Sequence, residues 1–240
     1  MNFGEILIYL NPLLILSAIY FGYQNLSKTD KKYDYLLYVI LGNHTFVLLL
    51  LSYYFLTTNL RLEYVSDYSA KDLSIGYKLA GVWAGRDGTL LIWSWATILT
   101  LVLERFFDKK GSKQRELTSL FGMILLLSLA IIQLYINPFD LNENTPEDGK
   151  GLNPLLLSPY MIIHPPIVFI SYGMIVLLYA SGLSFLVTED KNWNNTIKRW
   201  GRGSWIGMSL ALILGGFWAY VTLGWGGYWA WDPVETAGLL

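Results

Sequence analysis

Residues 204–235 read SWIGMSLALILGGFWAYVTLGWGGYWAWDPVE, an uncharged apolar run followed by aromatic residues and glycines that close with Asp-Pro-x-Glu. The run 204–223 has the length and composition of a membrane-crossing helix, which needs about 20 mostly apolar residues. The aromatic segment after it, residues 225–231, is unsuited to a core helix, because paired glycines weaken a helix and bulky rings crowd one another. Broad rings and closely approachable backbone suit a flat, apolar ligand. We therefore expect a membrane helix that leads directly into a ligand-binding segment.

The composition of the whole chain is that of a membrane protein. Of its 240 residues, 54% are hydrophobic and only 15% are charged, against about 25% charged in soluble domains. The net charge of −1 argues against a nucleic-acid surface, which would carry a clustered basic excess. The absence of cysteine from the sequence excludes disulfides, thiolate metal sites and cysteine nucleophiles. Histidine occurs only as His44 and His164, so a haem or metal bound by histidine has few ligands within this sequence.

Six segments are long and apolar enough to span a membrane. They are residues 6–23, 35–57, 88–107, 117–137, 161–187 and 204–223. The predicted fold is therefore all-α: a polytopic integral membrane protein with one transmembrane domain over residues 1–240, in which residues 224–240 hold the aromatic motif and the start of a following helix. Because Met1–Glu5 lacks the basic region of a cleavable signal, we expect the first apolar segment to remain as a span.

The distribution of basic residues predicts the orientation of the spans. Lys and Arg concentrate in the loops 24–34, 104–116 and 188–203, whereas the alternate loops 58–87 and 138–160 together hold more acid than base. By the positive-inside rule, the first three loops are cytoplasmic and the N-terminus is outside. The two acidic loops and everything after residue 223 then share the outer face.

The best candidate ligand is His164, at the start of the fifth span. In the preceding loop, Asn153-Pro154 and Ser158-Pro159 are pairs of N-cap and first helical residue, which predict two short helical turns. His164 precedes Pro165-Pro166, and a residue before proline is pushed out of the helical region, so we expect the imidazole at a helix start on the outer surface. There it shares a face with the aromatic segment and suits axial ligation of a haem iron. The alternative is a polar anchor at the interface.

Three other charged or ionisable residues are weaker candidates. His44 lies inside the second span, where an ionisable residue is a functional candidate by default, but we expect it to hydrogen-bond a neighbouring helix, far from His164. Lys78 and Arg86 either meet the propionates of a haem or extend into solvent.

The aromatic residues near residue 223 also have a plainer interpretation. Membrane interfaces are rich in Trp and Tyr. Such a belt accounts for one or two residues per helix end, however, and not for this set with its paired glycines: Trp218, Trp225, Tyr228, Trp229 and Trp231.

The acidic residues that close the segment predict a helix start. Asp232 as N-cap, Pro233 at the first helical position and Glu235 at the third resemble a capping box. We therefore interpret Asp232 and Glu235 as structural rather than as a catalytic acid pair.

Several motifs together resemble one family. The stretch Trp225-Gly226-Gly227-x-Trp229-x-Trp231-Asp232-Pro233-x-Glu235 is similar to the tryptophan-rich WWD signature of the haem-handling proteins of cytochrome c biogenesis. Further blocks resemble that family in the same order: Trp83-Ala84-Gly85-x-x-Gly88-Thr89-Leu90-Leu91-x-Trp93, Asn137-Pro138-Phe139, Leu152-Asn153-Pro154-Leu155-Leu156 and Ile163-His164-Pro165-Pro166. Within that superfamily, the chain resembles the CcmF-type haem lyases of system I cytochrome c maturation.

The resemblance implies a function in cytochrome c-type biogenesis, in which transiently held b-type haem is attached covalently to apocytochrome c at the outer, periplasmic-side face of the plasma (inner) membrane. It implies His164 as an axial ligand of the haem iron. It also implies a haem-binding shelf made of Trp225, Gly226, Gly227, Trp229, Trp231 and Asp232. No side chain is assigned as catalytic, because orientation and ligation would be the protein's contribution. The implied partners are a haem chaperone, apocytochrome c with its thiol-handling protein, and membrane lipid.

Members of that family continue through more spans, which carry a second outer histidine and the histidines of a haem within the membrane. The resemblance therefore implies an N-terminal portion of a larger unit or a split-gene product, completed by C-terminal helices that bring the second axial ligand. Two alternatives remain open. One is a haem carrier or export module that passes haem to a chaperone without catalysing attachment, and the other is a membrane anchor or transporter with an aromatic belt.

Overall fold

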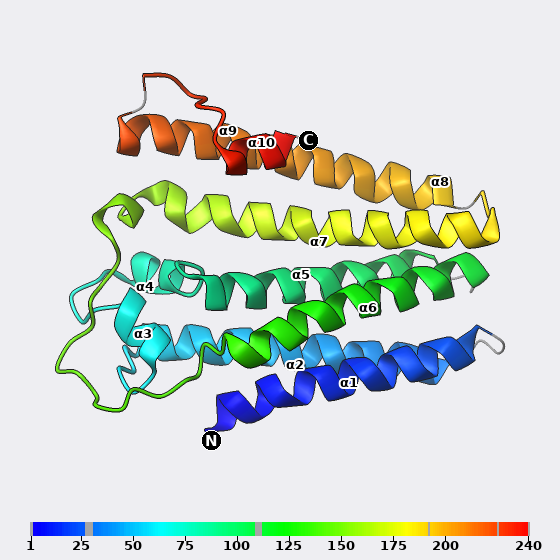
Figure 1. Cartoon of the computed structure of the whole chain (residues 1–240), viewed down its shortest axis with the longest axis horizontal. Helices are drawn as coiled ribbons and strands as arrows, with labels where there is room; N and C mark the ends of the chain where they lie inside the picture. The colour runs from blue at the N-terminus through cyan, green and yellow to red at the C-terminus, as the bar shows by residue number, and fades with distance from the viewer. Residues whose placement is uncertain (1, 27–30, 109–111, 192, 225, 240) are drawn as a thin grey trace.

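A computed structural model describes residues 2–26, 31–108, 112–191, 193–224 and 226–239, which hold helices and no β-strand. The long helices run side by side (Figure 1). They are α1 (Phe3–Asn25), α2 (Lys31–Leu56), α5 (Arg86–Phe107), α6 (Lys113–Tyr135), α7 (Pro159–Thr188) and α9 (Arg202–Leu223). The short elements are α3 (Glu63–Tyr68), α4 (Ile75–Gly81), the 3-10 turn η1 (Pro154–Leu156), α8 (Trp193–Thr196), the π-helical η2 (Ile197–Gly201) and α10 (Pro233–Leu239). Within these residues, six helical segments are long and apolar enough to cross a membrane, as predicted.

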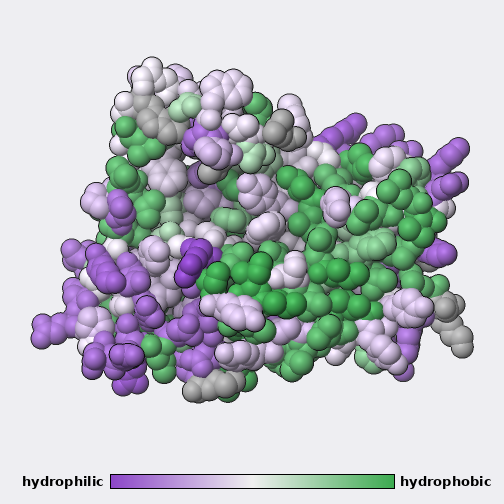
Figure 2. Space-filling model, viewed as in Figure 1, coloured by the Kyte–Doolittle hydropathy of each residue, from purple (hydrophilic) through white to green (hydrophobic). Residues whose placement is uncertain are grey.

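The helix α5 lies at the centre of the bundle, in contact with α2, α6 and α7. The helix α1 packs against α2 and α6. The helix α9 packs on the side of α7 that faces away from α5, and so lies at the edge of the bundle (Figure 1). Buried apolar side chains form two core clusters, one around Ile98 and Met123 and one around Leu51 and Phe139. On the face shown in Figure 2, apolar side chains cover much of the middle of the bundle and hydrophilic ones gather toward both ends, as expected for helices that cross a membrane.

The prediction of a loop over residues 188–203 is wrong in its second half, because helical structure runs from Trp193 to Leu223. The buried carboxylate of Glu104 on α5 explains the difference. It accepts hydrogen bonds from the Thr196 hydroxyl at 2.5 Å, from Arg199 at 2.9 Å and from the Trp200 indole at 2.6 Å. A buried charge needs such partners, and these three side chains converge on it from one helical segment.

The start of α7 also differs from the prediction. Asn153 caps η1, with its Oδ1 accepting from the Leu155 N–H at 2.9 Å, as expected. Ser158, however, caps α7 itself rather than a separate turn, with Pro159 as the first helical residue. The helix then continues through Pro165 and Pro166, so His164 lies in its second turn and not ahead of it. Proline has a φ that suits a helix, and the rule against helical conformation before proline is a bias that packing overrides.

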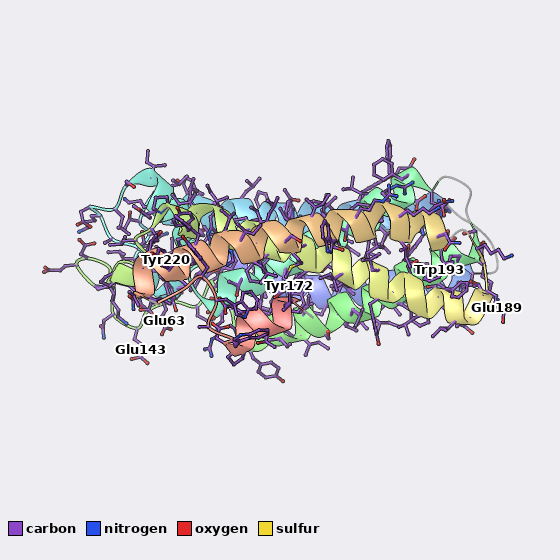
Figure 3. All side chains as sticks on the ribbon, turned by 90° about the horizontal axis from the view of Figure 1, so that it is seen from above. Glu63, Glu143, Tyr172, Glu189, Trp193 and Tyr220 are labelled. Carbon is purple, nitrogen blue, oxygen red and sulfur yellow. The ribbon has the colours of Figure 1, made fainter. Side chains whose placement is uncertain are left out.

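The loops 57–85 and 136–158 lie together at one end of the bundle. Glu63, Glu143 and Tyr220 lie at that end, and Glu189 and Trp193 at the opposite one (Figure 3). Lys150 bridges the two loops with an ion pair to Asp67 at 2.7 Å. The two loops and the C-terminal end of α9 are thus close to one another, which is the shared face that the alternation of spans predicts.

Candidate functional site

A cavity of about 600 Å³ lies between α7, α9, α10 and the turn before α5. Its volume falls in the range of ligand and cofactor sites, roughly 300–1,000 Å³. The walls are mostly apolar, and His164, Asp232 and Glu235 are among the lining residues with polar side chains. The α7 wall consists of Met161, His164, Pro165, Val168, Phe169 and Tyr172.

The imidazole of His164 is fixed by a hydrogen bond to the neighbouring helix. Its Nδ1 lies 2.9 Å from the carbonyl oxygen of Ala211 on α9. Because a carbonyl only accepts, Nδ1 carries the proton and Nε2 keeps a lone pair. Metal-binding histidines are held in this way, with the other ring nitrogen donating to a carbonyl or carboxylate. His164 is therefore prepared to offer Nε2 to a metal.

The ring of His164 packs tightly against α9. It meets Trp218 edge to face, with ring centroids 5.9 Å apart. A Cβ atom on Gly215 would stand 2.8 Å from His164 Cε1, inside van der Waals contact. Glycine at position 215 is therefore what lets the imidazole approach the helix closely enough to bond the Ala211 carbonyl.

The described residues after α9 turn back along that helix. Gly224 ends α9 with a φ of 66°, in the left-handed conformation that favours glycine. The ring of Tyr228 then lies 4.5 Å from that of Tyr220, and a Cβ on Gly216 would stand 2.6 Å from the Tyr228 carbonyl oxygen. As a result, α10 packs beside the middle of α9 (Figure 1).

The structure brings together only some of the predicted haem-binding residues. His164 and Asp232 line the cavity. Four described residues lie along the segment outside the cavity wall: Gly226, Gly227, Trp229 and Trp231. Trp229 and Trp231 pack edge to face at 5.5 Å, and Trp231 is 70% exposed. Trp225 lies outside the described residues.

Asp232 and Glu235 form a helix start, as predicted. Asp232 Oδ1 accepts the N–H of Glu235 at 2.6 Å, and α10 begins at Pro233. In a capping box, the Glu235 side chain would accept the N–H of the N-cap residue Asp232. Here Glu235 Oε2 instead accepts the N–H of Ala230, two residues earlier, at 2.9 Å. Both carboxylates are thus engaged with backbone while they line the cavity.

The other predicted candidates lie elsewhere. His44 is fully buried, and its Nδ1 is 2.9 Å from the Ile40 carbonyl of its own helix, not of a neighbour as expected. Lys78 donates to the Thr58 hydroxyl at 2.7 Å, and the Arg86 side chain is largely exposed. None of the three lines the cavity.

Sequence reasoning gave no site role to Trp83 or Tyr172, although both line the cavity. Tyr172 follows His164 by eight residues, so helical periodicity places the two on one face of α7. It lies near the middle of the bundle's length (Figure 3). Trp83 stands in the turn before α5. The signal that could have identified it is the family-like block that begins with Trp83-Ala84-Gly85.

The chemistry of the cavity fits a haem through one axial ligand. It provides a single imidazole with a free Nε2, apolar walls and aromatic rings. The described lining residues include no Lys or Arg for the propionates. His164 is the one histidine among the described residues that line the cavity.

Fold and site together define the class: a multi-pass helical membrane protein with a cavity that presents a tethered histidine. Residues 83–240 match the family described as Cytochrome C assembly protein. The chain belongs to that family.

Individual relatives agree with this assignment. The chain is 34% identical over 195 residues to the cytochrome c-type biogenesis protein NrfE of Haemophilus influenzae, which covers 80% of this chain and 31% of the relative. It is 31% identical over 196 residues to CcmF of the same organism, covering 79% and 30%. The solved structure of Cytochrome c Heme Lyase CcmF matches 98% of this chain and 39% of its own with a TM-score of 0.81; at 20% identity, that likeness shows the fold. The chain thus spans about a third of the length of these sequence relatives.

Proposed function

We propose that this chain acts in cytochrome c-type biogenesis as the haem-holding part of a haem lyase. The observation that carries the proposal is the state of His164: Nδ1 is tied to the Ala211 carbonyl, so Nε2 keeps its lone pair, and the side chain lines an apolar cavity of about 600 Å³. The relatives are named as cytochrome c-type biogenesis proteins, which supports the same function.

The residues of the cavity bind and orient the haem. His164 would offer Nε2 to the iron, and its hydrogen bond to α9 fixes the plane of the imidazole ring. The apolar walls of α7 and α9 exclude water from the ligated face. Haem supplies the vinyl groups to which the cysteine thiols of an apocytochrome c add. This chain has no cysteine, so it offers no competing thiol.

The aromatic segment provides the surface on which the haem arrives. Asp232 places the end of the segment at the cavity, and the exposed ring of Trp231 is available to lie against a flat ligand. In this proposal Trp225, Gly226, Gly227 and Trp229 complete the shelf, with glycines that let the haem approach the backbone.

The proposed location is the outer, periplasmic face of the plasma membrane, with the N-terminus outside and residues 1–240 acting as one haem-handling domain. A haem chaperone delivers b-type haem, and apocytochrome c with its thiol-handling protein receives it. A second ligand for the iron would come from C-terminal helices, because His44 is buried in α2 and bonded within that helix.

The test is the haem content of the chain in membranes of cells that mature cytochrome c, with His164→Ala compared to His44→Ala. We expect His164→Ala to lose haem or its axial-ligand spectrum, and to leave haem-loaded chaperone accumulating while mature cytochrome c falls. His44→Ala should keep the haem at the cavity. A fall in loaded chaperone would assign the chain to haem export instead. Equal haem content and identical spectra in wild type and His164→Ala would refute the ligand assignment.

A further inference from the structure

The turn of α7 that carries His164 has a gap in its hydrogen bonding. Pro165 has no N–H to donate to the carbonyl of Met161, four residues earlier. Met161 is 2% exposed, so water does not readily replace that donor. A buried backbone acceptor without a partner costs free energy comparable to a lost hydrogen bond. This turn therefore needs a donor from outside the helix.

The indole of Trp83 supplies that donor. Its Nε1–H donates to the Met161 carbonyl at 2.8 Å, although the two residues lie 78 positions apart in the chain. The turn that carries Trp83 is itself held by the Tyr64 hydroxyl, which lies 3.1 Å from the Val82 carbonyl and accepts the Gly85 N–H at 3.0 Å. A fixed turn between α4 and α5 thus holds the first part of α7.

We propose that Trp83 is a positioning residue for His164, acting through the Met161 carbonyl. Two contacts then define where the imidazole stands. The bond to Ala211 orients the ring, and the bond from Trp83 holds the helical turn from which the ring projects. Because Pro165 prevents that turn from closing its own bond, loss of the indole N–H releases it. The proposal rests on the proposed function in taking His164 as the haem ligand.

The test compares two Trp→Phe variants of the whole protein. Trp83→Phe removes the indole N–H and keeps an aromatic ring at the cavity. Trp95→Phe is the matched control, because it also removes one indole hydrogen bond, made to the Thr45 hydroxyl at 3.0 Å. The probes are amide hydrogen exchange of residues 160–164 without haem, and the absorption spectrum and haem affinity with haem.

We expect Trp83→Phe alone to speed amide exchange at the start of α7. With haem, it should shift the axial-ligand spectrum toward that of His164→Ala and weaken haem binding about 10- to 100-fold, as for other residues that orient a metal ligand. Trp95→Phe should leave the amide exchange of residues 160–164 and the spectrum unchanged. If the two variants behave alike in both measurements, the proposal is overturned.

A second variant tests the route through Met161. Pro165→Ala restores an N–H that can donate to the Met161 carbonyl within the helix. In that background Trp83→Phe should have little further effect on exchange or spectrum, since residues that share one acceptor are energetically coupled. An undiminished effect of Trp83→Phe would contradict this route. If His164→Ala leaves bound haem unchanged, the proposed function fails, while the haem-free exchange experiment still decides whether Trp83 holds the turn.

Discussion

Gly215→Ala should weaken haem binding while the bundle stays folded. An added Cβ would stand 2.8 Å from Cε1 and 3.4 Å from Nδ1 of His164, so the imidazole must move. The ring is the end of a side chain and can rotate away without moving a helix. That rotation carries Nδ1 off the Ala211 carbonyl, which now lies 2.9 Å away. The substitution therefore acts on the orientation of the ligand.

Two opposing contributions keep the effect on stability small. Replacing glycine by alanine inside a helix gains up to about 1 kcal/mol. Losing the bond between His164 and Ala211 costs about 0.5–1.5 kcal/mol net. Haem affinity has no such compensation, because a ligating histidine that loses its outer partner weakens metal binding about 10- to 100-fold. That corresponds to about 1.4–2.8 kcal/mol of binding free energy.

The measurement is a haem titration of the protein in membranes, followed by the absorption spectrum, together with the thermal unfolding midpoint. Gly182→Ala is the matched control, because position 182 is also inside a long helix and a Cβ there meets nothing within 4 Å. It should keep wild-type haem affinity. If Gly215→Ala binds haem as tightly as Gly182→Ala, the crowding of the imidazole against α9 does not control ligation and the reasoning fails.

Two further predictions concern stability. Glu104→Gln removes the negative charge that accepts hydrogen bonds from Arg199 and Trp200. The free energy of unfolding should therefore fall by about 1.5–3 kcal/mol, while the haem spectrum stays unchanged. An unaltered thermal unfolding midpoint would contradict the role given to Glu104. Burial, followed by the negative charges of Glu5 and Glu63, raises the pKa of Asp140 above its ordinary value. The folded state then binds the proton more tightly than the unfolded state, so this group's contribution to stability falls as pH rises through the raised pKa. Asp140→Asn should therefore raise the unfolding midpoint at neutral pH and lose that advantage below the ordinary aspartate pKa, and a gain independent of pH would count against this account.

The fold was predictable because its main elements, the membrane spans, depend on continuous stretches of sequence. A membrane span needs a continuous apolar run, and all six predicted runs lie within observed long helical segments or overlap them almost completely. The predicted helix bounds were wrong where a contact with another helix decides the local structure. The basic stretch before residue 203 has the composition of a loop, but Arg199 and Trp200 find Glu104 on α5 and the segment is helical.

The candidate site was predictable to the level of side-chain chemistry. His164 was singled out from its residue type and its neighbours, and it does line the cavity, together with Asp232. Its place in the second turn of α7 was not predicted, because the rule for residues before proline describes an isolated chain. The outward exposure of Trp231 follows from the path of the segment along α9, which composition does not specify.

The partners of His164 were beyond sequence reasoning for a simple reason. Ala211 and Met161 act through carbonyl oxygens, which every residue has, so their identity carries no signal. What the sequence does carry is the requirement that such contacts create. Pro165 removes a donor and so requires one from elsewhere, which Trp83 provides. Gly215 and Gly216 leave space on the surface of α9. The His164 imidazole lies against Gly215, and the Tyr228 carbonyl lies against Gly216. Prolines and glycines within a predicted span are therefore where a tertiary contact should be sought, and here both kinds of position lead to the same histidine.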